Sequence, residues 1–230
     1  MQQKYQRKII ILMFFLYMLY VPEGAVFGQE TMSVPPGLKR IAVMPFLRGR
    51  INIDAQEKKK LPLDMKFSQL VLEDENLKTG AESTMTEIFQ QVFEAKTNNL
   101  LVSFPLTKSA YSTLDVNLKD GTPRIMAKTL GSKLKADYVI VGTVWRFRER
   151  GSVQRDSMSP ASVAFTVYLV DVPTGKTLWS DTFDKTQQAL SENILGAAEF
   201  FKQGARWLSA EKLARYGARD IVTKLQKRLY

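Results

Sequence analysis

The residue types that most often carry catalysis and metal binding are missing from this chain. Its 230 residues include no histidine and no cysteine. Without histidine there is no imidazole base for a Ser–His–Asp triad, and most zinc and haem sites are lost as well. Without cysteine there is no thiolate nucleophile, no iron–sulfur ligand and no disulfide. We therefore expect no cofactor, no metal site and no enzyme of these classes.

The remaining motifs that resemble catalytic ones are incomplete. Residues 174–177 read Thr-Gly-Lys-Thr, like the end of a phosphate-binding loop, but Val170 stands where that loop needs glycine. The motif also falls in an expected hairpin and not before a helix. Two Ser-x-x-Lys pairs, at 132–135 and 209–212, lack the other elements of the acyl-transfer enzymes. Three carboxylates flank the hairpin and are expected to be solvated at strand ends: Asp171, Asp181 and Asp184.

Aromatic and cationic side chains gather at a break between two expected helices. They are Phe200, Phe201, Lys202, Arg206 and Trp207. One interpretation places these aromatics in the core at a helix end. The other makes them a contact surface for a partner protein or for anionic headgroups, because Trp and Phe beside Lys and Arg suit both. Trp145, flanked by Arg146 and Arg148, admits the same two interpretations.

The charge of the chain favours anionic partners. Its net charge is +10, with 45% hydrophobic residues, a proportion typical of a globular protein. A balance this basic suits envelope proteins with acidic surfaces, acidic glycans or anionic membrane surfaces. The alternative is that the lysines and arginines are scattered over a solvated surface and bind no particular partner. Nucleic acid is disfavoured as a partner, because the amino terminus indicates export and an exported protein rarely meets nucleic acid.

The amino terminus has the design of a secretory signal. Lys4, Arg7 and Lys8 precede an apolar run over residues 9–21, and small residues follow up to Gly28. The run is shorter than the roughly 20 residues that span a bilayer, so a cleaved signal is favoured over a retained anchor. Without cysteine the chain cannot carry a lipid at a new amino terminus. We expect an exported protein, in the periplasm or at the periplasmic face of the outer membrane.

Periodicity indicates the elements around these residues. Alternating apolar residues predict strands at 162–169 and 177–183, and an apolar, β-branched run predicts a central strand from Asp137. Shorter strands are expected at 40–46 and 100–106, with a further short one near 67–72 inside the polar loop 47–79.

Four helices complete the expected fold. Helical spacing predicts 81–97, with buried Met85, Ile88, Phe89, Val92 and Phe93. Pro123 begins a second helix to about Lys135, with Ile125, Met126, Leu130 and Leu134 buried. The last two helices cover 192–203 and a stretch capped by Ser209.

These elements predict an α/β (α+β) sandwich, in which a mixed central sheet of about four to five strands has helices packed on it. We expect a signal peptide at 1–28, an extended leader at 29–39, an α/β domain at 40–190 and a C-terminal helical pair at 191–230, packed on the domain.

The order of these motifs resembles the curli-secretion-channel superfamily. The residues that carry the resemblance are 41–46, the helix before Asp137, the strand 139–143, and Leu169-Val-Asp171 with Gly175 and Leu178-Trp179. Relatives include the Pel polysaccharide-export lipoprotein, the outer-membrane activator of penicillin-binding proteins and the amino-terminal domain of the Tol-system propeller protein. The resemblance implies an anticodon-binding-like fold and a non-enzymatic role in the envelope, often in rings.

Together these observations predict a non-enzymatic accessory protein that scaffolds envelope biogenesis or secretion. A subunit of an export ring or channel, and hence a homo-oligomer, is the alternative, and an enzyme comes third. The chain departs from its relatives in lacking a lipidated cysteine. Its loops 47–79 and 148–160 also lack the alternating spans of about ten residues that a pore hairpin requires.

Overall fold

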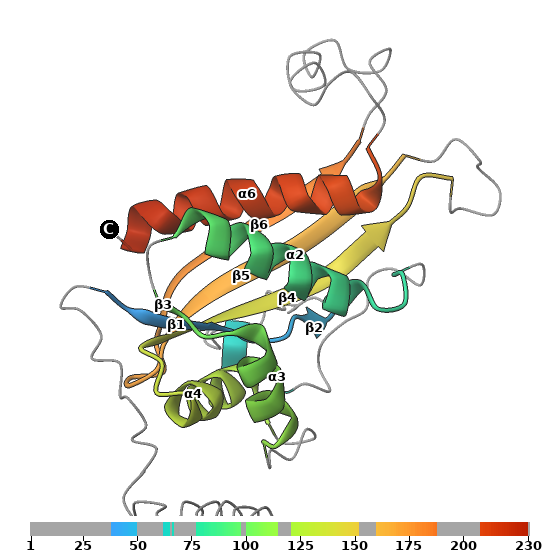
Figure 1. The fold of residues 1–230 in the computed structure, drawn as a ribbon. Coiled ribbons are helices and arrows are strands. Elements are labelled where there is room, and N and C mark those ends of the chain that lie inside the picture. Colours follow the sequence, from blue (N-terminus) through green and yellow to red (C-terminus); the bar gives the residue numbers. More distant parts are fainter. Residues whose placement is uncertain are drawn as a thin grey trace, which may run out of the picture. The chain divides into compact units, whose positions relative to one another are not determined.

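The chain folds around a mixed β-sheet, which Figure 1 shows crossing the middle of the molecule. The strands are β1 (Arg40–Val43), β2 (Leu47–Arg48), β3 (Leu100–Leu101), β4 (Tyr138–Arg148), β5 (Ser162–Asp171) and β6 (Thr177–Thr186). They lie in the spatial order β3-β1-β4-β5-β6, and β2 also pairs with β4. β1 pairs in parallel with β3 and with β4, and β2 pairs in parallel with β4. β5 pairs antiparallel with β4 and with β6. The predicted mixed sheet is confirmed.

The computed structural model describes residues 38–49, 62–64, 66, 77–97, 100–114, 121–151, 160–187 and 208–229, all within the unit Val34–Tyr230. The predicted signal peptide, most of the leader, the strand near 67–72 and the helix at 192–203 lie outside these residues. Among the described helices, none is long and apolar enough to cross a membrane.

Helices cover both faces of the sheet. They are α2 (Ala81–Lys96), α3 (Phe104–Ser112), α4 (Pro123–Lys133) and α6 (Ala210–Leu229), with a 3-10 turn, η2 (Pro62–Asp64). In Figure 1, α2 and α6 lie side by side over one face, while α3 and α4 lie on the other. Each face has an apolar core of its own, as expected of an α/β sandwich.

The core beneath α2 and α6 follows the predicted helical stripe. All five predicted residues of α2 are buried: Met85, Ile88, Phe89, Val92 and Phe93. α6 buries an equivalent stripe: Leu213, Ile221, Val222 and Leu225. Fully burying a side chain of this size contributes about 1.5–3 kcal/mol, so the two helices are held mainly by this core. Ser209 caps α6 as predicted, since its Oγ accepts from the Lys212 N–H at 3.3 Å.

On the opposite face, α4 contributes a narrower stripe than the sequence predicts. Met126 and Leu130 are buried, as is Leu134 just past the helix end. Ile125, expected on the same side, is 52% exposed, so that prediction is wrong. Successive helical residues are separated by about 100°, so Ile125 lies about 120° from the centre of the face that Met126 and Leu130 form, outside the buried stripe.

The predicted strand at 100–106 is also corrected. β3 ends at Leu101, and α3 begins at Phe104. Pro105, in the first turn of α3, lacks a backbone N–H and has a φ that suits a helix start. An apolar run this short is ambiguous between strand and helix, and here it contains the end of one and the start of the other.

The central strand is placed as predicted, with β1 on one side and β5 on the other. The hairpin between β5 and β6 turns at Gly175, whose φ of 72° favours glycine. Its turn is fixed by Asp171, whose Oδ2 accepts from the Thr174 N–H at 3.0 Å. The Thr-Gly-Lys-Thr stretch therefore belongs to a hairpin and does not precede a helix.

Candidate functional site

The aromatic break predicted as a contact surface lies outside the described residues. This holds for Phe200, Phe201, Lys202, Arg206 and Trp207, and their role stays a prediction. The chain is described again from Leu208, whose backbone N–H donates to Oε1 of Gln187 at 2.8 Å, after the end of β6.

Trp145, the aromatic member of the second predicted cluster, is 2% exposed. It lies where the pairing of β4 with β5 shifts register, between Val144 and Arg146. A bulge adds one residue to a strand and changes the direction of its side chain. Burial favours the core interpretation of Trp145 over the contact interpretation.

Arg146 and Arg148 lie on the same face of β4. Phe147, between them, is buried in the core beneath α2 and α6. Since successive side chains of a strand point to opposite faces, both arginines point away from those helices. Their cross-strand partners on β5 are small, because Arg146 pairs with Ala164 and Arg148 with Ser162.

The two arginines differ in their ion pairs. Arg146 donates from Nη2 to Oδ1 of Asp184 on β6. Asp184, expected from the sequence to be only solvated, therefore forms an ion pair. Among the described residues, Arg148 has no ion-pair partner. In both side chains Nε is buried and has no hydrogen-bond acceptor within the described part of the chain. Among the described residues, two cations and one carboxylate give this end of the sheet face a positive charge.

A row of hydroxyl groups extends the same face across β5 to β6. The Thr166 and Thr182 hydroxyls are 2.7 Å apart, and those of Ser162 and Thr186 are 2.6 Å apart. Cross-strand hydroxyl pairs of this kind stabilise antiparallel strands modestly. Sequence reasoning missed this polar row as part of a site, although the alternation in β5 already placed Ser162 and Thr166 on one face.

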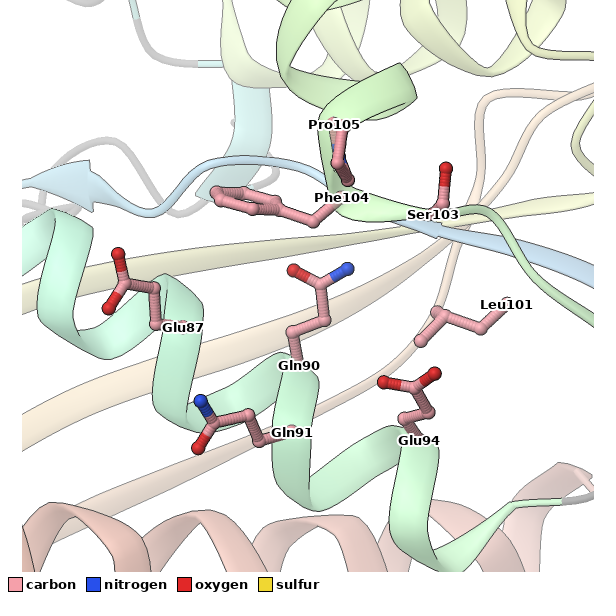
Figure 2. A pocket seen from close by; sticks show the side chains of 8 residues that line it. All are labelled: Glu87, Gln90, Gln91, Glu94, Leu101, Ser103, Phe104 and Pro105. Carbon is pink, nitrogen blue, oxygen red and sulfur yellow. The ribbon is translucent and has the colours of Figure 1, made fainter.

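A pocket of about 370 Å³ lies at the opposite edge of the sheet, between α2, β3 and the start of α3. Figure 2 shows the residues that line it: Glu87, Gln90, Gln91, Glu94, Leu101, Ser103, Phe104 and Pro105. Sequence reasoning did not find this pocket. Within the described residues, no group of three or more Asp, Glu, His or Cys side chains could hold a metal ion.

Comparisons with known proteins give matches among solved structures alone. No protein-family model and no curated protein matches the chain. A dodecamer of PelC from Paraburkholderia phytofirmans is 14% identical, with a TM-score of 0.44, over 83% of this chain and 89% of that chain. The LpoB C-terminal domain from Salmonella enterica is 16% identical, with a TM-score of 0.38, over 65% and 83%.

A third solved structure is the hypothetical protein CT253 from Chlamydia trachomatis. It is 12% identical, with a TM-score of 0.44, and the match covers 84% of this chain and 98% of that chain. At such identities and TM-scores the matches assign no activity, ligand or partner to this chain. The solved structures that are similar to it thus include PelC and LpoB, two of the relatives to which the sequence motifs also point.

Proposed function

We propose that this protein is a non-enzymatic accessory protein of the cell envelope. It is exported to the periplasm or the periplasmic face of the outer membrane, where it scaffolds biogenesis or secretion by binding an anionic partner. The observation that carries this proposal is the placement of Arg146 and Arg148 on one sheet face, where Asp184 supplies the single carboxylate among the described residues. The net charge of +10 supports it by attracting polyanions from a distance.

The chemistry of this face suits a carboxylate-bearing ligand. A guanidinium presents planar, forked N–H donors that match the two oxygens of a carboxylate. Because Nε of each arginine is buried, the outer nitrogens of the guanidinium are the groups left to contact a ligand. A carboxylate bound there would compensate the charge of Arg148, which no described residue balances.

The test is the affinity of the purified protein for a carboxylate-bearing polysaccharide, polygalacturonate, measured by calorimetry at low salt. We expect Arg148→Gln to weaken binding about tenfold, since a hydrogen bond to a charged group is worth roughly 1.5–3 kcal/mol. Arg219→Gln is the matched control, because Arg219 is exposed on α6, away from this face. Its effect should stay below about twofold.

Two outcomes would overturn this assignment of the site. Equal losses in Arg148→Gln and Arg219→Gln would mean that diffuse charge, and not this face, binds the polymer. If the protein did not bind the polysaccharide but did bind vesicles of phosphatidylglycerol, its partner would be an anionic membrane surface and not a glycan.

A subunit of an export ring or channel is the second candidate function. One observation favours it: β6 pairs with β5 alone among the described strands, so the outer edge of a ten-residue strand has no described partner. An open edge of this length can pair with a neighbouring copy. The mass of the protein in solution separates the two functions.

A further inference from the structure

The pocket at the β3 edge of the sheet has the opposite charge to the arginine face. Its wall on α2 presents two exposed carboxylates, Glu87 and Glu94, one turn to either side of Gln90. Neither carboxylate has an ion-pair partner among the described residues. Two unbalanced negative charges stand out in a chain whose net charge is +10, and they favour a cationic ligand.

Gln90 supplies a second, independent indication of a ligand. It is 7% exposed, and Figure 2 shows its amide directed from α2 into the pocket, between the two carboxylates and below Phe104. Within the described residues this amide makes no hydrogen bond. The neighbouring Gln91 is different, since its Oε1 already accepts from Arg215 at 3.0 Å.

The strand beside the pocket has a free edge. β3 is the last strand on its side of the sheet and pairs with β1 alone among the described strands. Val102 donates its N–H to the carbonyl oxygen of Ile41 at 2.8 Å. Because backbone groups of adjacent residues in a strand point to opposite sides, the N–H and C=O of Leu101 point away from β1. Leu101 also lines the pocket, together with Gln90 and Glu94, so the free edge of β3 adjoins the pocket.

We propose that this pocket binds an extended segment of a partner protein, whose backbone pairs with Leu101 and whose arginine side chain enters between Glu87 and Glu94. Addition of a strand to a sheet edge satisfies the free backbone groups, and a side-chain pocket beside the edge gives specificity. The volume of about 370 Å³ is at the lower end for ligand pockets, and it suits one long side chain.

Arginine fits the acceptors better than lysine does. Its guanidinium carries five N–H donors in a plane, so it can donate to a carboxylate and to the Gln90 amide oxygen at the same time, whereas the lysine ammonium is a compact point charge. Phe104 also lines the pocket, above Gln90 in Figure 2, and an aromatic face attracts a guanidinium. This site is separate from the arginine face in both charge and position, so it goes beyond the proposed function.

The test uses the ¹⁵N-labelled protein and a short peptide, acetyl-TVRVT-amide, titrated while the backbone and side-chain amide resonances are followed. The control peptide, acetyl-TVQVT-amide, keeps the strand-forming residues and loses the cation. We expect the arginine peptide to bind at least about tenfold more tightly, with the largest shifts at the Gln90 side-chain amide and Leu101.

The variant Glu94→Gln tests whether the carboxylate of the pocket attracts the peptide. Its matched control is Asp220→Asn, which also replaces one carboxylate by an amide. Both carboxylates are on exposed residues, but only Glu94 lines the pocket. Asp220 lies on α6, where it pairs with Lys224 at 2.9 Å. Glu94→Gln should weaken the arginine peptide about fivefold or more, while Asp220→Asn changes its affinity less than about twofold. Arg148→Gln should leave peptide binding unchanged, which keeps this result independent of the anionic-partner site.

Three outcomes would each overturn the proposal. Equal affinity for the glutamine and arginine peptides would mean that the pocket does not recognise the positive charge of the arginine side chain. Equal losses of peptide affinity in Glu94→Gln and Asp220→Asn would mean that negative charge anywhere on the surface, and not the pocket, attracts the peptide. Binding of arginine amide as tight as that of the peptide would mean that the site takes a free small cation and that β3 adds no strand.

Discussion

At the scale of single residues, Gly142 explains how the aromatic core can lie directly on the sheet. A Cβ atom at this position of β4 would lie 2.3 Å from the ring of Phe46, closer than non-bonded atoms approach. With hydrogen in its place, that ring lies against the strand and contacts the rings of Phe89 and Phe165, with centroids 5.7 and 6.2 Å away. Aromatic pairs at such distances contribute about 0.5–1.5 kcal/mol beyond their buried area.

We expect Gly142→Ala to lower the free energy of unfolding by about 1–3 kcal/mol, because the added methyl group displaces the Phe46 ring from a filled core. Denaturant unfolding followed by circular dichroism measures the change. The double variant Gly142→Ala with Phe46→Leu should be destabilised by less than the sum of its two single changes, since the smaller side chain leaves room. A single variant as stable as the natural chain would mean that this contact is not tight.

At the scale of elements, a lysine joins α6 to the sheet edge. Nζ of Lys224 lies 2.9 Å from Oδ2 of Asp181 on β6 and 2.9 Å from Oδ2 of Asp220, one turn earlier in α6. The hydrogen bond to Asp181, followed by that to Asp220, raises the pKa of Lys224 above its ordinary value. The side chain is 49% exposed, so solvent screens the interaction.

The direction of this shift determines its pH dependence. A raised pKa in the folded state means that the stabilisation is fully present below the ordinary value of 10.5 and is lost as the pH rises through the folded pKa. We expect the melting temperature of Lys224→Met to lie below that of the natural chain by a constant amount between about pH 6 and pH 9. The difference should shrink only above 10.5.

Thermal melts of both proteins across the alkaline range test this expectation. Lys227→Met is the control, because Lys227 is exposed on α6 and has no described ion pair. Its melting temperature should follow that of the natural chain at every pH. A difference for Lys224→Met that already declines between about pH 6 and pH 9 would contradict the assignment to this lysine.

Long elements could be predicted from the sequence because one periodic pattern covers each of them. α2 and β5 present stripes at periods of 3.6 and two, and burial follows those stripes. Residues 100–106 could not be assigned in this way, since seven apolar and small residues contain both β3 and the first turn of α3. Ile125 was misplaced because its exposure depends on where α4 is docked, which periodicity does not determine.

The candidate sites could be predicted only where one strand carries them. Arg146 and Arg148 are two residues apart, so a strand places them on one face, whereas Asp184, the ion-pair partner of Arg146, comes from β6. The pocket was missed because its parts lie on α2, β3 and α3, and only the fold brings Gln90 beside Leu101. The aromatic break, including Trp207, lies outside the described residues, so its role stays a prediction.

At the scale of the whole molecule, the described surface offers little apolar area for a permanent interface. The exposed large hydrophobic side chains among the described residues are Leu106 on α3, Ile125 on α4 and Leu178 on β6, so they lie on three different elements. Obligate interfaces are larger and more hydrophobic than this distribution supplies. The open edge of β6 also carries charged side chains, including Asp184 and Lys185, and charge on an edge strand opposes pairing with another copy.

We therefore expect the protein to be a monomer at micromolar concentration, as an accessory protein with transient partners would be. Sedimentation velocity over a range of concentrations and at two salt concentrations measures its mass. A ring would need an interface of about 800 Å² on each subunit, and the described apolar residues are too dispersed for it. High salt should not change the mass, because a monomer has no interface to screen. A stable assembly with a mass of several chains would favour the ring-forming function, and Leu178→Asp on the β6 edge would then show whether that edge forms the contact.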